Sequence, residues 1–144
     1  MLNYSVAELR LYTIVGTLYN VHKELGPGLN EKIYQEGLKT ELELQNIPYK
    51  REYTVKPIYK GKLLDAEYKL DFLIDDDIVI ELKAVSSLTD EHRAQLFNYM
   101  HLVRPKAGIL VNFSSKSCVL ERYLFDSTNN RITTMTGESL YRNK

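Results

Sequence analysis

The sequence predicts an α/β domain in which a mixed β-sheet is flanked by α-helices. Two stretches near the amino terminus repeat apolar residues with the 3.6-residue period of a helix. The stretch that follows alternates apolar and polar residues with the period of two that strands show. Further along, a strand pattern, a helix pattern and an uninterrupted apolar run follow one another, which indicates a right-handed parallel crossover.

The first two predicted elements are helices. Ser5 and Glu8 form the pattern of a capping box, and apolar residues then keep helical spacing as far as Gly26. Asn30 is expected to cap a second helix, which ends before Pro48. The buried side of this second helix is predicted to consist of Ile33, Tyr34, Leu38 and Leu42.

Strand patterns dominate the middle of the chain. Alternation over residues 49–56 predicts one strand, and Gly61 supplies the turn after it. A long strand with one apolar face is expected from Leu64 to Ile74. The acidic residues Asp75 to Asp77 then form a turn, and Ile78 to Lys83 is the next strand.

The second half of the chain predicts the crossover. Thr89 is expected to cap a helix that continues through Leu102 and stops before Pro105. The run from Ala107 to Val111 is typical of a strand covered on both faces. Residues 118–125 are a further predicted strand.

The composition fits a single domain over residues 1–144. Apolar residues make up 44% of the chain, enough to form a core without a disulfide or metal staple. The core is expected over about residues 5–125, and residues 126–144 form a polar C-terminal extension with no assigned element. Cys118 has no partner for a disulfide. The chain shows neither a secretory signal nor an apolar run of membrane-spanning length, so we expect a cytoplasmic protein without membrane contact.

Charge is balanced overall but uneven along the chain. The 19 basic and 19 acidic residues cancel, which argues against a protein that coats nucleic acid through a global basic field. A contact with nucleic acid must therefore be local. The candidate stretch, residues 50–69, carries the cations Lys50, Arg51, Lys56, Lys60, Lys62 and Lys69 against Glu52, Asp65 and Glu67.

Asp71 and Glu81 are the strongest candidates for chemistry. Counting outward from a turn at residues 75–77 places Asp71 opposite Glu81 on one face of the two strands. Lys83 lies on the same face, opposite Lys69. Like charges so placed repel, and a hard cation such as Mg²⁺ or Mn²⁺ would neutralise them. Exposed strands also carry charged residues, so the pattern leaves a metal site and a solvated surface about equally open.

The order of these residues resembles the PD-(D/E)xK nuclease superfamily. Asp71 is followed on the next strand by Glu81-Leu82-Lys83, then by a helix and a buried strand. Residues 28–34, with Gly, Glu and Tyr at the first, fourth and seventh positions, fit the GxxExxY signature of a small bacterial and archaeal family placed in that superfamily. The matches run in order from about Gly26 to Phe113, although Leu70 replaces the proline of the superfamily motif. The resemblance implies a restriction-endonuclease-like fold.

The resemblance also implies roles for individual residues. Asp71 and Glu81 would bind the metal together with the backbone carbonyl of Leu82. Lys83 would position or polarise the water nucleophile. Glu31 resembles a helical acid that supports the metal shell in many of these nucleases, although a helix amino terminus also favours an acid for electrostatic reasons alone.

Gln95 and Tyr99 are four residues apart and share a helix face. They resemble the Gln and Tyr that orient the site or the strand in one branch of these nucleases, and they equally fit an ordinary amphipathic helix. Together with Tyr99, the basic residues Lys50, Arg51 and Lys69 are the expected nucleic-acid contacts.

The sequence therefore predicts a metal-dependent nuclease that uses Mg²⁺ or Mn²⁺, with DNA favoured over RNA through the resemblance alone. The alternative is a catalytically silent module that binds nucleic acid or a protein partner. The presence of Asp71, Glu81 and Lys83 together argues against that alternative. A structural protein with a solvated charged face is a third interpretation. The oligomeric state stays open, a homodimer included.

Overall fold

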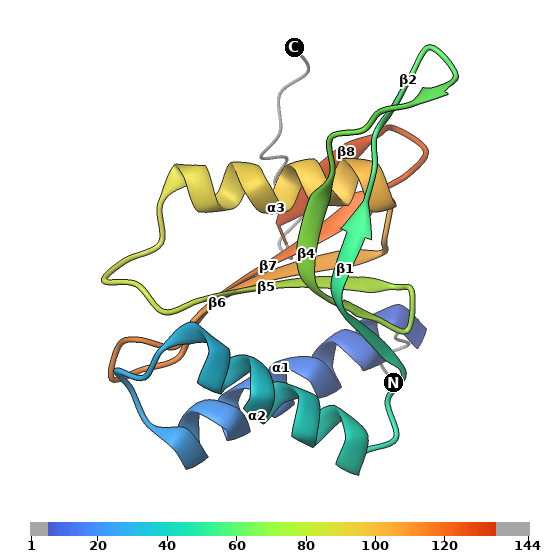
Figure 1. The fold of residues 1–144 in the computed structure, drawn as a ribbon. Helices are drawn as coiled ribbons and strands as arrows, with labels where there is room; N and C mark the ends of the chain where they lie inside the picture. The colour runs from blue at the N-terminus through green and yellow to red at the C-terminus, as the bar shows by residue number, and fades with distance from the viewer. Residues whose placement is uncertain (1–5, 135–144) are drawn as a thin grey trace.

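The computed structural model describes residues 6–134, which form a mixed six-stranded sheet with helices on both faces (Figure 1). The elements in chain order are α1 (Val6–Leu25), α2 (Glu31–Leu44), β1 (Tyr49–Val55), β2 (Ile58–Tyr59), β3 (Lys62–Leu63), β4 (Tyr68–Ile74), β5 (Ile78–Lys83), α3 (Asp90–Val103), β6 (Ala107–Asn112), β7 (Val119–Asp126) and β8 (Arg131–Thr134). The strand order is β1-β4-β5-β6-β7-β8, while β2 and β3 form a separate ribbon. Helices α1 and α2 cover one face and α3 covers the other, which confirms the predicted fold class.

Both amino-terminal helices are confirmed. Helix α1 ends at Leu25, directly before Gly26, and its expected cap Ser5 lies outside the described residues. Asn30 caps α2, because its side chain accepts a hydrogen bond from the backbone N–H of Ile33 at 3.2 Å. The prediction that Ile33 is buried is wrong. Its side chain is 42% exposed, since it lines an open groove between α1 and α2.

The hairpin of β4 and β5 has the predicted register next to its turn at residues 75–77. The ladder stops three pairs from the turn. The prediction that Asp71 pairs with Glu81, and Lys69 with Lys83, within this ladder is therefore wrong. The observed pairs are Phe72 with Ile80, Leu73 with Val79 and Ile74 with Ile78.

A bend in β1 and β4 explains why the ladder stops. Glu52 in β1 has the left-handed φ of 52°. Phe72 packs in the core under α1 and α2, whereas Leu70 packs in the core against α3, although a flat strand would place both on one face. The predicted continuous strand from Leu64 to Ile74 is therefore wrong, and β4 begins at Tyr68. Figure 1 shows β1 and β4 turning away from the sheet beside α3.

The crossover from β5 through α3 to β6 is confirmed, and β5 and β6 are parallel. Thr89 caps α3: its side chain accepts from the N–H of His92 at 3.3 Å, and His92 Nδ1 accepts from the N–H of Thr89 at 3.0 Å. Arg104 adopts a left-handed conformation at the end of the helix, just before Pro105. Every residue of β6 is buried. Within residues 6–134, no helix is both long and apolar enough to cross a bilayer.

The sheet continues beyond the predicted core boundary at residue 125. Arg131–Thr134 forms β8 against β7, and Ile132 is fully buried there. Part of the range 126–144, to which the sequence pattern assigned no element, is therefore a strand. The strand is short and mostly polar, so it carries little of the periodicity from which strands are predicted.

Candidate metal and catalytic site

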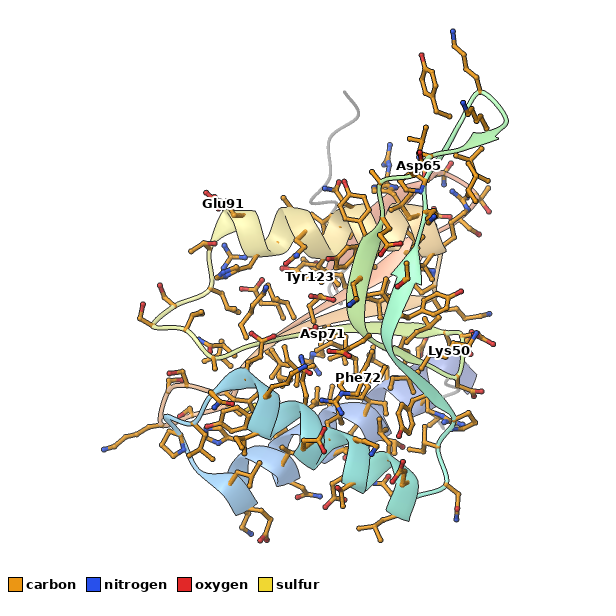
Figure 2. All side chains as sticks on the ribbon, viewed as in Figure 1. Lys50, Asp65, Asp71, Phe72, Glu91 and Tyr123 are labelled. Carbon is orange, nitrogen blue, oxygen red and sulfur yellow. The ribbon has the colours of Figure 1, made fainter. Side chains whose placement is uncertain are left out.

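Asp71 and Glu81 meet where the ladder between β4 and β5 stops, and each carboxylate bonds to the backbone of the opposite strand. The N–H of Asp71 donates to Glu81 Oε1 at 2.9 Å, and the N–H of Leu82 donates to Asp71 Oδ2 at 2.8 Å. Figure 2 shows Asp71 near the centre of the molecule, between α3 and the layer of α1 and α2. At the bend, side chains thus satisfy N–H groups that would otherwise pair in the ladder.

Burial makes this pair of acids costly to ionise. Glu81 is 2% exposed, and burial, reinforced by the Asp71 carboxylate, raises the pKa of Glu81. Burial also raises the pKa of Asp71, against the opposing effects of the Leu82 N–H and the Lys83 ammonium. Each carboxylate also accepts a backbone N–H, Glu81 from Asp71 and Asp71 from Leu82. Without a cation, the pair therefore retains a proton at pH values at which carboxylic acids in water are already ionised.

Lys83 is held on the α3 side of β5 by a chain of hydrogen bonds. Its Nζ donates to Gln95 Oε1 at 3.0 Å, and Gln95 Nε2 donates to Tyr99 Oη at 3.0 Å. Tyr99 Oη in turn donates to the backbone carbonyl of Lys69 at 3.2 Å. Because an ammonium only donates, the amide oxygen of Gln95 must face Lys83, which fixes the direction of the whole chain.

The loop between α1 and α2 is tied to the helix that follows it. Gly28 has a φ of 84°, which glycine adopts without a steric penalty. The hydroxyl of the buried Tyr34 donates to the carbonyl of Gly26 at 2.5 Å and accepts from the N–H of Leu29 at 3.1 Å. The Tyr34 ring stacks on Phe113 with centroids 4.6 Å apart. These contacts fix the position of the first turn of α2.

The first two turns of α2 present Glu31 and Gln35 to the acidic pair. Gln35 Nε2 lies 3.3 Å from Asp71 Oδ1 and 3.4 Å from Glu31 Oε1. Burial and the Asp71 carboxylate raise the pKa of Glu31, while Lys83 opposes them, so all these groups share one electrostatic environment. The sequence pattern did not single out Gln35. Its position four residues after Glu31, on the same helix face, was the available signal.

Two of the predicted nucleic-acid contacts are engaged within the protein. Arg51 Nη2 donates to Gln35 Oε1 at 3.2 Å, and Arg51 also forms an ion pair with Glu36 of α2. Lys50 pairs with Asp76 at 3.2 Å, at the turn of the hairpin. Arg51 therefore anchors Gln35, and Lys50 lies on the turn side of the hairpin, away from the acidic pair.

The predicted site residues divide into three groups. The structure brings together Asp71, Glu81, Leu82, Lys83, Glu31 and Gln95. The side chain of Lys69, two residues before Asp71 in β4, is exposed, whereas Tyr99 is 3% exposed and reaches the group through Gln95. Lys50 and Arg51 have the separate partners described above.

Comparisons with known proteins identify the family. A family model described as the PD-(D/E)XK nuclease superfamily matches residues 8–122. The chain belongs to this superfamily. The crystal structure of SSO0001 is similar, with a TM-score of 0.52 and 24% identity over 68% of this chain. The chain spans about half of that protein's length, 52%. No curated protein matches the sequence.

The superfamily match covers every residue of the candidate site, from Glu31 to Tyr99. It therefore supports the resemblance at the level of the superfamily. The likeness to SSO0001 is evidence for the restriction-endonuclease-like fold alone.

PD-(D/E)XK nucleases generally depend on divalent metals, and the donor set of this chain fits such an ion. Asp71 and Glu81 offer hard oxygen ligands from a buried pair whose charges repel each other. Across residues 6–134, no group of three or more His, Cys, Asp or Glu side chains is arranged to hold a metal. Mg²⁺ does not need one, because one or two carboxylates, completed by water and phosphate oxygens, are its common protein ligands.

Proposed function

We propose that this chain is a divalent-metal-dependent nuclease that hydrolyses phosphodiester bonds. The observation that carries the proposal is the buried contact between Asp71 and Glu81, with Lys83 two residues further along the same strand. A solvated charged face would leave these acids in water, whereas Glu81 is almost fully buried. Withdrawing Glu81 fully and Asp71 partly from water costs free energy, which a catalytic metal site explains.

The carboxylates of Asp71 and Glu81 and the carbonyl of Leu82 would hold Mg²⁺ or Mn²⁺. Bound there, the ion would neutralise the pair, bind a phosphate oxygen and lower the pKa of a water molecule. The two acids must lose their shared proton to act as ligands, so metal affinity should rise with pH.

Lys83 would act on the reacting groups directly. One of its three N–H donors is used by Gln95, which leaves the others for the attacking water or for charge that builds up on the phosphate. Gln95 and Tyr99 would act as positioning residues, because their hydrogen bonds hold the ammonium in place. Tyr99 is too deeply buried to serve as a surface contact for nucleic acid.

Glu31 and Gln35 would support the site from α2. Gln35 donates to Asp71 and accepts from Arg51, so it keeps the Asp71 carboxylate oriented. Glu31 would complete the polar shell around a bound ion or its water. Its position in the first helical turn and its raised pKa suit a group that accepts a proton from water.

The GxxExxY signature has a physical basis that supports assigning the chain to that group. Gly28 provides a left-handed turn, and Glu31 reaches the site. Tyr34 locks the intervening loop through its hydroxyl. The substrate would be nucleic acid, with DNA favoured by the nuclease family and Lys69 exposed beside the site to contact phosphate.

A cleavage assay tests the proposal. The purified chain is incubated with linear, circular and single-stranded DNA and with RNA, in Mg²⁺, in Mn²⁺ or in EDTA. We expect cleavage that requires a metal and that falls at least about 100-fold in Asp71→Asn and in Lys83→Met. Asp76→Asn is the matched control, because it removes an acid from the same hairpin outside the site, and it should cleave as the wild type does.

Two outcomes contradict the proposal. The wild-type chain could leave every substrate intact with both metals. Alternatively, Asp71→Asn and Lys83→Met could cleave at the wild-type rate, which would assign the activity to a contaminant or to another site.

A further inference from the structure

The ribbon of β2 and β3 stands apart from the body of the protein. Figure 1 shows it extending past α3 from the ends of β1 and β4. Ile58, Tyr59 and Leu63 in this ribbon are each more than half exposed. A ribbon with two residues in each strand has no core of its own, and exposed apolar side chains gathered on a projection commonly mark a contact with a partner.

The charge of the ribbon indicates what kind of partner fits it. Residues 56–63 contain Lys56, Lys60 and Lys62 and no acid. Within residues 6–134 none of these lysines forms an ion pair, in contrast to Lys50. Lys60 Nζ lies 5.5 Å from the centroid of the Tyr59 ring. Lysines beside an exposed aromatic ring suit a phosphate backbone with sugars and bases next to it.

The ribbon is joined to the candidate site by the two strands that carry it. Strand β4 runs from Tyr68, next to the ribbon, through the exposed Lys69 to Asp71. Asp71 follows Gly61, at the tip of the ribbon, by ten positions, which limits their separation to roughly 33 Å along an extended chain. At about 3.4 Å for each base pair, that reach corresponds to about ten base pairs.

We propose that the β2–β3 ribbon is a second contact for the nucleic-acid substrate, within about ten base pairs of the bond that is cut. Lys60 and Lys62 bind backbone phosphates, and Tyr59 packs on a sugar or base. The inference rests on the proposed function, because it places the substrate at Asp71. Asp65 and Glu67 follow the ribbon, so the positive charge is confined to its outer part.

Binding of labelled duplexes tests the ribbon. Fluorescence anisotropy is measured with the chain carrying Lys83→Met, which keeps the DNA intact, on duplexes of about 8 and about 30 base pairs over a range of salt. Adding Lys60→Ser and Lys62→Ser should weaken binding of the longer duplex about tenfold and reduce the salt slope by about two. The loss should be smaller for the short duplex, which cannot span both contacts. Tyr59→Ser alone should also weaken binding of the longer duplex.

A control pair, Lys23→Ser with Lys106→Ser, removes the same charge from exposed sites outside the ribbon and should bind as the parent does. Circular dichroism melts should be the same for all variants, because the changed side chains are exposed. Equal affinity and equal salt slope in the ribbon variant would overturn the proposal. So would a ribbon variant that only changes the molar mass measured by light scattering, which would assign the ribbon to a second copy of the chain.

The two proposals fail separately. Cleavage by the wild type, with binding that does not depend on the ribbon, removes the ribbon contact and keeps the nuclease. Ribbon-dependent binding without cleavage on any substrate removes the nuclease and keeps the ribbon contact.

Discussion

Two groups of acidic residues lie on the same β-hairpin and differ in almost every physical respect. Asp75 to Asp77 form the turn, where Asp75 pairs with Arg10 at 3.3 Å and Asp76 pairs with Lys50 at 3.2 Å. Asp71 and Glu81 lie at the other end of the paired region, where Glu81 is buried, Asp71 is partly buried, and each carboxylate accepts a backbone N–H from the opposite strand.

The turn acids are explained by the backbone. Asp75 and Asp76 both have positive φ, 51° and 57°, which Asp tolerates better than most residues, and the N–H of Asp77 closes the turn by donating to the carbonyl of Ile74 at 2.8 Å. Asp71 and Glu81 have no such explanation, because their environment makes their charges costly. The comparison teaches that burial and contact, and not the number of acids in a row, distinguish a candidate site from a solvated turn.

After Asp71→Asn and Lys83→Met, the largest expected effect comes from a change in α2. Gln35→Leu removes the bonds to Asp71 and Arg51, and we expect cleavage to fall about 10- to 100-fold because the Asp71 carboxylate loses its orientation. Steady-state kinetics measures the loss, with Gln45→Leu at the other end of the same helix as the control. If Gln35→Leu cleaved like that control, Gln35 would have no part in the site.

Glu81→Gln tests whether the charge of Glu81 destabilises the folded chain, as its burial predicts. A pKa raised on folding means that the folded chain binds the Glu81 proton more firmly than the unfolded chain, so the metal-free wild type loses stability as pH rises above about 4.5. The Gln variant cannot ionise. It should therefore unfold at a higher temperature than the wild type at pH 8, by about 1–3 kcal/mol of unfolding free energy, and show little difference at pH 5.

Thermal melts followed by circular dichroism in EDTA at several pH values measure this crossover. Asp76→Asn, which alters the turn, should show no such pH-dependent gain. If the difference in stability between Glu81→Gln and the wild type were the same at every pH, ionisation of Glu81 would not destabilise the folded chain.

Gln95→Leu should have a smaller effect on cleavage. The variant deletes the acceptor for Lys83, and one hydrogen bond to a charged group of about 1.4 kcal/mol corresponds to about a tenfold loss in rate. Gln95→Glu keeps an acceptor oxygen and should recover most of the rate, which a packing role would not predict. Rates measured across pH for the three proteins decide between the two roles.

The smallest expected effect belongs to the turn. Asp76→Asn removes an exposed ion pair with Lys50 and keeps a residue that tolerates positive φ, so unfolding in urea should change by no more than about 0.5 kcal/mol. A much larger loss of stability, or a loss of cleavage, would break the distinction between the two acidic groups.

Much of the fold could be predicted because its signals are local. The capping residues Asn30 and Thr89 predicted two helices, and the apolar run from Ala107 to Val111 predicted strand β6. The hairpin register near the turn followed from alternation, since a slip of one residue would expose Phe72 or Ile80.

The rest of the fold depended on contacts distant in sequence. The bend at Glu52 places Leu70 in the core against α3, whereas Phe72 lies in the core under α1 and α2. The local sequence pattern does not predict this bend. Ile33 is exposed because the α1–α2 groove is open, although its spacing fits a buried face. Strand β8 is too short and polar to produce a clear period.

The candidate site also combines features that local sequence patterns predict with features that depend on contacts distant in sequence. Asp71, Glu81 and Lys83 were identified from their order and spacing, but their contact arises from side-chain bonds at the bend and not from the predicted ladder pair. Gln35 was missed because its importance lies in bonds to β1 and β4, which only the folded chain reveals. Tyr99 shares the predicted helix face with Gln95, but its hydroxyl points to a backbone carbonyl and not to solvent.

The most direct test of the central claim, that Asp71 and Glu81 form a divalent-metal site, is calorimetric titration of the metal-free chain with Mn²⁺ at neutral pH. Measurements in two buffers of different ionisation enthalpy count the protons released. We predict binding accompanied by proton release, and a large loss of affinity in both Asp71→Asn and Glu81→Gln. Absence of binding, or unchanged binding in those two variants, would contradict the account.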